Sequence, residues 1–272
     1  MLRFALPVAY ALFLWWFSTG LILYLDRLAR RTYRTSILWA SGLLVLSIVG
    51  VIGVRSQTTL LGAYLGFTCG VLIWGWLEMT YFMDVITGPR KQPCPTPCGQ
   101  LERFWLAIQT SLYHELAIMV AGIGLIVLTL DYHNQVATWT FIILWWMRWS
   151  AKLNLFLGVP NLNEEWLPPH LRFLTTYLAK RPINLFFPVV VTVATVVMSL
   201  LVEQALELPA DSFTAIALLL TATLLALAIL EHWFLILPLP DAALWDWLLE
   251  QPPPVIEPDK TAKAVKQLPT PP

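Results

Sequence analysis

The sequence predicts an all-α fold, a bundle of seven helices that cross a membrane. The chain of 272 residues is 58% hydrophobic and only 12% charged, whereas a typical soluble domain has roughly 25% charged residues. Its apolar residues form runs that are long enough to span a bilayer, and its lysines and arginines gather in every second gap between these runs. The formal net charge is zero, so the composition gives no indication of nucleic acid as a partner.

Seven apolar runs meet the length of about 20 residues that a spanning helix needs. The first starts almost at the N-terminus and is too long for the apolar part of a signal peptide, so we expect it to remain as a span. The third carries two overlapping G-x-x-x-G steps, which favour close packing of a neighbouring helix inside the bundle. The runs are 4–25, 36–54, 58–82, 104–130, 136–158, 184–203 and 212–237.

The charged residues between the runs predict how the chain is oriented. The first, third and fifth loops and the C-terminal tail are basic. The other loops together contain a single lysine or arginine, Arg55. The positive-inside rule therefore places the N-terminus in the periplasm and the C-terminus in the cytoplasm. The residues that carry this bias are Arg27, Arg30, Arg31, Arg34, Arg90, Lys91, Arg103, Arg172, Lys180, Arg181, Lys260, Lys263 and Lys266.

The end of the chain differs in composition from the spans. Asp241 can cap a short helix whose tryptophans and leucines form an apolar surface, which predicts a helix near 241–250 that lies in the cytoplasmic interface. From residue 251 onward the chain is rich in proline and polar residues. We therefore expect a transmembrane domain over 1–250 and a disordered cytoplasmic tail over 251–272.

Polar side chains inside the predicted spans are the candidates for function, because an ionisable residue there costs roughly 2.5–3.5 kcal/mol to insert. With the predicted orientation they all fall in the cytoplasmic half of the third, fourth, fifth and seventh spans. The simplest interpretation is charge pairing, since Arg148 and Lys152 share a helix face and can neutralise the glutamates. The predicted cluster comprises Glu78, His114, Glu115, Arg148, Lys152, Asn154, Glu231 and His232.

A ligand site is the alternative interpretation of the same residues. A transition metal would take its ligands from Glu78, His114, Glu115, Glu231 and His232. The sequence lacks the Glu-x-x-His pairs of dimetal bundles, and adjacent residues of a helix point about 100° apart, so both members of a His–Glu pair can hardly face one metal. A single histidine could instead bind the central metal of a tetrapyrrole.

The longest connection between spans, 159–183, adds two further candidates. Pro168 and Pro169 predict the start of a short helix over 169–179. Its tryptophan, tyrosine and basic residues suit a position at the membrane interface. Glu165 and His170 are therefore candidate residues at the cytoplasmic mouth of the predicted cluster.

Several longer blocks of sequence coincide with these polar positions. They read Glu-Met-Thr-Tyr-Phe-Met-Asp-Val-Ile-Thr-Gly-Pro-Arg (78–90), Tyr-His-Glu-Leu-Ala (113–117), Arg-Trp-Ser-Ala-Lys-Leu-Asn (148–154) and Leu-Pro-Pro-His-Leu-Arg-Phe-Leu (167–174). With similar blocks at 184–188 and 231–245, they resemble the photosynthetic complex assembly protein family of the PuhE type over residues 60–248. The resemblance assigns no role to any single residue.

The resemblance implies a multi-pass protein of the bacterial inner membrane, cytoplasmic or intracytoplasmic, in an anoxygenic phototroph. It implies an assembly factor for reaction centre and light-harvesting complexes that handles bacteriochlorophyll. The sequence shows no hydrolase or nucleotide-binding signature, so an enzyme is the less favoured expectation. The expected partners are then the lipid bilayer and either photosynthetic complex subunits or pigment-synthesis enzymes. Two other functions remain open: a membrane metalloenzyme acting on a pigment or lipid-like precursor, and a small-molecule or proton transporter with Glu78 and Glu115 as relays.

Overall fold

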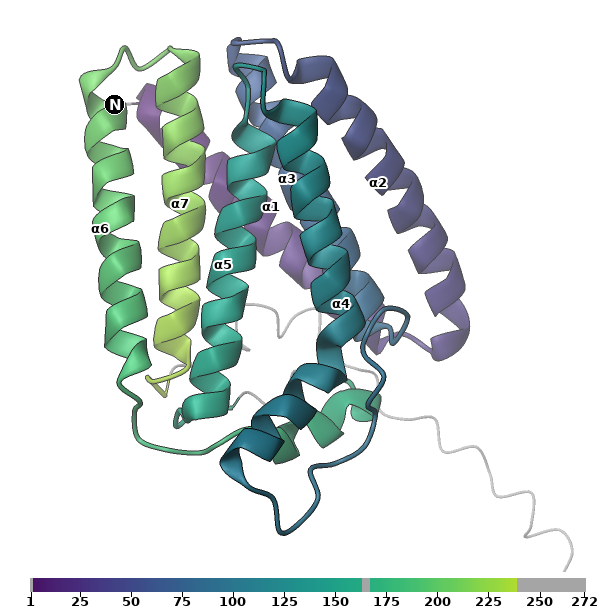
Figure 1. Cartoon of the computed structure of the whole chain (residues 1–272). Helices are drawn as coiled ribbons and strands as arrows, with labels where there is room; N and C mark the ends of the chain where they lie inside the picture. Colours follow the sequence, from purple (N-terminus) through teal and green to yellow (C-terminus); the bar gives the residue numbers. More distant parts are fainter. Residues whose placement is uncertain (1, 163–166, 239–272) are drawn as a thin grey trace, which may run out of the picture.

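The computed structural model describes residues 2–162 and 167–238, and its regular elements are all helices (Figure 1). Within these ranges the only extended pairing is an isolated bridge between Val159 and Lys180. The predicted all-α class is therefore confirmed for the described part of the chain. Its long helices are α1 (Leu2–Arg27), α2 (Tyr33–Val54), α3 (Leu60–Phe82), α4 (Gln100–Thr129), α5 (Val136–Leu157), α6 (Phe186–Glu207) and α7 (Phe213–Phe234).

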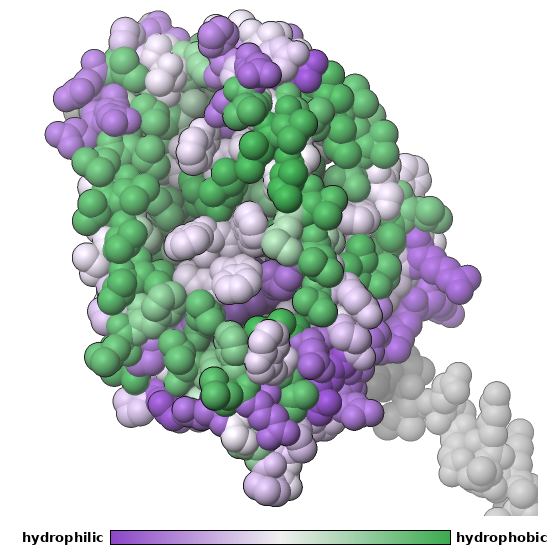
Figure 2. Space-filling model, in the orientation of Figure 1, coloured by the Kyte–Doolittle hydropathy of each residue, from purple (hydrophilic) through white to green (hydrophobic). Residues whose placement is uncertain are grey.

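Six of these helices, all except α5, are long and apolar enough to cross a membrane. Helix α5 is also 22 residues long, but it contains an arginine, a lysine and four tryptophans, which lower its hydropathy. The described residues thus contain six candidate spans, which fits a multi-pass membrane protein, and the fifth predicted span, 136–158, is not confirmed. Figure 2 shows the matching surface, with hydrophobic residues over the middle of the visible face and hydrophilic residues at both ends.

Helix α3 lies at the centre of the bundle, where it contacts α1, α2, α4, α5 and α7. Its small residues allow this position. A Cβ atom added to Gly70 would lie 2.8 Å from the carbonyl oxygen of Ala137 and about as close to Thr140, so α3 and α5 approach more closely than larger side chains would permit. The predicted G-x-x-x-G face therefore packs inside the bundle.

Asn134, in the turn between α4 and α5, connects two turns at one end of the bundle by hydrogen bonds. Its Nδ2 atom lies within 3.2 Å of the carbonyl oxygens of Val54, Gln57 and Gly62, and its Oδ1 accepts a hydrogen bond from the backbone of Val136. The α4–α5 turn is thereby joined to the α2–α3 turn. These contacts lie at the opposite end of the helices from the polar cluster.

Two 3-10 helices lie between the long helices: η1 (Arg30–Thr32) and η3 (Pro169–Tyr177). The prediction of a short helix from Pro169 is confirmed, although it is a 3-10 helix that ends at Tyr177 rather than at 179. Leu171 and Tyr177 are both buried against the bundle. The predicted interfacial helix at 241–250, the tail over 251–272 and Glu165 lie outside the described residues.

Candidate functional site

Glu78 of α3 and Arg148 of α5 form the centre of the polar cluster. An oxygen of Glu78 (Oε2) lies 2.9 Å from the Nη2 atom of Arg148, while its other oxygen (Oε1) lies 3.8 Å from the Nε2 atom of His114 on α4. The side chain of Glu78 is 9% exposed and that of His114 is fully buried, whereas that of Arg148 is 31% exposed. Three of the predicted residues are thus brought together from three helices.

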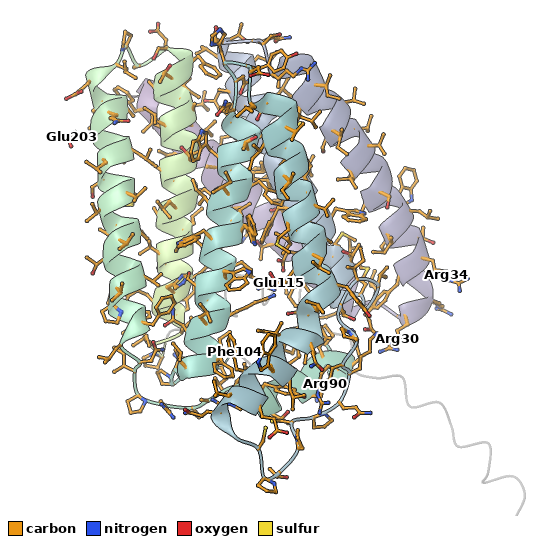
Figure 3. All side chains as sticks on the ribbon, in the orientation of Figure 1. Arg30, Arg34, Arg90, Phe104, Glu115 and Glu203 are labelled. Carbon is orange, nitrogen blue, oxygen red and sulfur yellow. The ribbon has the colours of Figure 1, made fainter. Side chains whose placement is uncertain are left out.

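A second ion pair lies one helical turn further along α5. Lys152 pairs with Glu115 of α4, and the indole nitrogen of Trp149 donates a hydrogen bond of 2.7 Å to the same carboxylate. Figure 3 shows Glu115 in the space between α4 and α5. Because residues i and i+4 share a helix face, Arg148 and Lys152 together present two positive charges to α3 and α4.

A break in α4 places His114 and Glu115. Ser111 has a non-helical conformation (φ −128°, ψ 15°), so the helix consists of two segments that meet at an angle. At this point the preceding loop replaces bonds that a regular helix would make: the backbone N–H of His114 donates to the carbonyl of Thr87 (2.9 Å), and that of Arg90 donates to Gln109 (3.3 Å). Bonds from an inserted segment are a recognised cause of helix kinks.

The loop can approach the break because residue 88 is a glycine. A Cβ atom at Gly88 would overlap the backbone of Gln109 and Thr110. The block that links α3 to α4 therefore has a structural role. It shapes the segment of α4 that faces Glu78.

Asp26 belongs to this cluster, although the sequence analysis did not include it. It lies one residue before the C-terminal end of α1, is only 5% exposed, and interacts electrostatically with Glu78. Neither of its carboxyl oxygens has a hydrogen-bond partner in the described part of the chain. The predicted first span ended at residue 25, so Asp26 was assigned to the basic loop. Asp26 is the single acidic residue of α1, and this isolation in an apolar run could have identified it from the sequence.

Three predicted residues lie beside this centre rather than in it. Asn154 is buried at the end of α5, where it donates to the carbonyl of Ser150 (2.9 Å). The ring of His232 contacts the hydroxyl of Ser150 and the carbonyl of Ala228, each at 2.8 Å, so both of its nitrogens are occupied. Glu231 is exposed; it accepts a hydrogen bond from the indole of Trp15 (2.9 Å) and interacts electrostatically with Arg148.

The helix η3 covers the cytoplasmic end that we predict for α3. The ring nitrogen Nε2 of His170 donates to the carbonyl of Phe82 (2.8 Å), and burial lowers the pKa of His170 below its usual value. Arg90 donates to the hydroxyl of Tyr177 (2.5 Å), which joins η3 to the α3–α4 loop. His170 therefore lies one turn of α3 beyond Glu78.

The geometry gives little support to a metal or to axial ligation of a tetrapyrrole. Among the described residues, no group of three or more His, Cys, Asp or Glu side chains is arranged to hold a metal ion. Both ring nitrogens of His114 lack a hydrogen-bond partner, but its ring is fully enclosed and the ring of Tyr81 lies 4.6 Å away. His232 is also buried. Neither histidine is accessible to a macrocycle in this conformation.

The protein is 37% identical over 254 residues to an uncharacterized 30.4 kDa protein of the puhA 5′ region in Rhodobacter capsulatus, which covers 92% of this chain and 91% of the relative. No solved structure matches the chain. The model of a protein family described as a protein of unknown function, DUF3623, matches residues 1–255. The chain therefore belongs to the DUF3623 family.

Proposed function

We propose that the protein is an inner-membrane assembly factor, of the PuhE type, for photosynthetic reaction centre and light-harvesting complexes. The observation that carries this proposal is the genetic location of its relative, in the puhA 5′ region of a photosynthetic bacterium. The identity extends over nearly the whole of both chains. A photosynthesis-related role is therefore a reasonable inference for this member of the family as well.

We propose in addition that all seven long helices cross the membrane, with the N-terminus in the periplasm. Helix α5 contacts α3, α4, α6 and α7, and its cations pair with carboxylates of other helices instead of facing lipid. In Figure 3, Arg30, Arg34 and Arg90 lie toward one end of the bundle and Glu203 lies toward the other. This distribution agrees with the positive-inside rule.

The cysteines of the α3–α4 loop offer a test of this orientation. Cys94 and Cys98 are free and partly exposed, whereas Cys69 is buried within α3. A membrane-impermeant maleimide is expected to label inverted vesicles but not intact cells, and labelling should be lost when both loop cysteines are replaced by serine. Labelling of intact cells at these two positions would contradict the proposed topology.

Bacteriochlorophyll handling forms the second part of the proposed role, and the surface of α5 supports it better than the histidines do. Trp139, Trp146 and Trp149 are 55%, 71% and 44% exposed, and their spacing places them along one side of the helix. Indole rings provide large flat contact surfaces for aromatic or lipid-like ligands. Trp149 also connects this side of α5 to the ion pair of Glu115.

Deletion of the gene in its own phototrophic host tests the assembly role. We expect fewer reaction centres per unit of membrane protein, measured from the light-induced absorbance change, and restoration by the wild-type gene. Arg148→Gln should restore less than wild type, whereas Glu203→Gln, which changes an exposed carboxylate on α6, should restore fully. Immunoblots must show that both variants reach the membrane in equal amounts.

Two outcomes of the deletion separate the parts of the proposal. A loss of reaction centres with unchanged total bacteriochlorophyll supports assembly without pigment handling. Parallel changes in extracted bacteriochlorophyll and in complexes support both parts. Unchanged levels of complexes and pigment under phototrophic growth would reject the proposed function.

A further inference from the structure

The charges of the polar cluster do not balance. Besides its histidines and tyrosines, it contains four acidic and two basic side chains: Asp26, Glu78, Glu115 and Glu231 against Arg148 and Lys152. Each cation lies next to one carboxylate, Arg148 next to Glu78 and Lys152 next to Glu115. Of the two remaining carboxylates, Glu231 is exposed, but Asp26 is buried.

Asp26 has the surroundings of a carboxyl group that lacks a positive partner. It is 5% exposed, both of its oxygens are without a hydrogen-bond partner among the described residues, and it interacts electrostatically with the carboxylate of Glu78. The oxygen Oε1 of Glu78 is likewise buried without a hydrogen-bond partner among the described residues. Two neighbouring carboxylates away from water cannot both remain ionised at low cost, because burial and like charge both favour the neutral acid.

We propose that Asp26, beside Glu78, forms a proton-binding site, in which the carboxylate of Asp26 takes up one proton and becomes a carboxylic acid. A proton fits the site better than a metal ion does, because the described residues contain no group of three His, Cys, Asp or Glu ligands around it. The site is independent of any role in photosynthesis.

The groups around the pair come from each of the neighbouring helices. The ring nitrogens of His114 are unpartnered, so this histidine is available to accept or donate a hydrogen bond at the site. Arg148 holds the other oxygen of Glu78 and so retains one negative charge there. The titratable and charged groups near the pair are Tyr33 from α2, Tyr81 from α3, His114 and Glu115 from α4, Arg148 and Lys152 from α5, and Glu231 from α7.

The position of Asp26 gives the proton a short route to water. Asp26 is the penultimate residue of α1; the exposed Arg27 follows it directly, and the exposed Arg30 begins η1. The hydroxyl of Tyr33 donates a hydrogen bond of 2.5 Å to the backbone carbonyl of Asp26. This bond fixes the backbone of the α1–α2 turn at Asp26, close to the basic end of the bundle.

Infrared spectroscopy of the full-length protein in lipid nanodiscs tests the proposal, because a protonated carboxylic acid has a carbonyl stretching band that a carboxylate lacks. At neutral pH the wild type should show this band. Asp26→Asn should lose the area of about one carboxyl group. Asp84→Asn is the matched control, since Asp84 lies in the α3–α4 loop, where it pairs with Lys91 at 2.6 Å. Its spectrum should keep the band.

A second measurement uses the same two variants and does not depend on band assignment. If the folded protein holds a proton that the unfolded chain releases, raising the pH must destabilise the wild type relative to Asp26→Asn. The melting temperature of the wild type should therefore fall relative to that of Asp26→Asn between about pH 5 and about pH 8. Asp84→Asn should follow the wild type.

Several results would overturn the proton site. These are an acid band that Asp26→Asn leaves unchanged, the absence of any acid band in the wild type at neutral pH, and parallel melting curves for wild type and Asp26→Asn. A fourth is loss of the band when sodium or potassium chloride is added at constant pH, because a metal cation would then occupy the place of the proton.

Discussion

Removal of either partner of the Arg148–Glu78 ion pair should destabilise the protein, but by unequal amounts. Arg148→Met leaves Glu78, which is 9% exposed, next to Asp26 and without its cation. Breaking a buried pair in this way costs about 3–5 kcal/mol, and the 31% exposure of Arg148 favours the lower end, about 3 kcal/mol. Glu78→Gln leaves Arg148 within the field of Glu115 and Glu231, so we expect a cost of about 1 kcal/mol.

The double variant measures the interaction itself. Because Arg148→Met and Glu78→Gln together remove both charges, the double variant should cost less than the sum of the single variants by about 1–2 kcal/mol. Reversible unfolding in mixed micelles with increasing sodium dodecyl sulfate, followed by tryptophan fluorescence, provides the free energies. Equal costs for the two single variants, or strict additivity, would refute the argument that the site has an excess of carboxylates.

Further predictions concern the loops. Gly88→Ala should destabilise the protein by about 1–3 kcal/mol because its Cβ overlaps the backbone of α4, whereas Gly124→Ala, where a Cβ meets nothing within 4 Å, should cost nothing. Asn134→Ala should cost about 3 kcal/mol in the same unfolding assay, because it leaves buried carbonyl groups without a donor, while Gln135→Ala, whose bonds lie near the surface, should cost less than 1 kcal/mol. Since burial lowers the pKa of His170, its neutral form stabilises the fold, and this contribution is lost as the pH falls below about 6.5. Melting curves should therefore show that wild type loses stability relative to His170→Gln between about pH 7 and about pH 5, and a constant difference would contradict this.

The helices were predictable because bilayer thickness imposes a minimum length on each apolar run. The predicted runs 136–158 and 212–237 match α5 (Val136–Leu157) and α7 (Phe213–Phe234) closely. The prediction was less accurate for α4, which starts at Gln100 instead of 104 because its first turns are amphipathic and hydropathy underestimates them. The break at Ser111 was not predictable from α4 alone, because a contact with another segment causes it and no proline marks it.

The depth of the charged residues predicted the centre of the site but not its limits. The sequence placed Glu78, His114 and Arg148 at one level of the membrane, and the structure brings them together. His232 has the same predicted depth, yet its ring faces Ser150, because depth along a helix does not determine the direction in which a side chain points. Asp26 was missed because a boundary drawn one residue too early moved it from a span into a loop.

The kink at Ser111 divides α4 into two segments, and the α3–α4 loop connects them. In this loop, Thr87 and Arg90 form backbone hydrogen bonds with α4 in place of bonds that the helix lacks. Arg90 also donates a hydrogen bond to Tyr177 of η3. The membrane half of α4 can therefore tilt only if this loop moves with it. A displacement of this loop would therefore also shift His114 and Glu115 relative to α3 and α5, so the polar cluster depends on a segment that lies outside the helices.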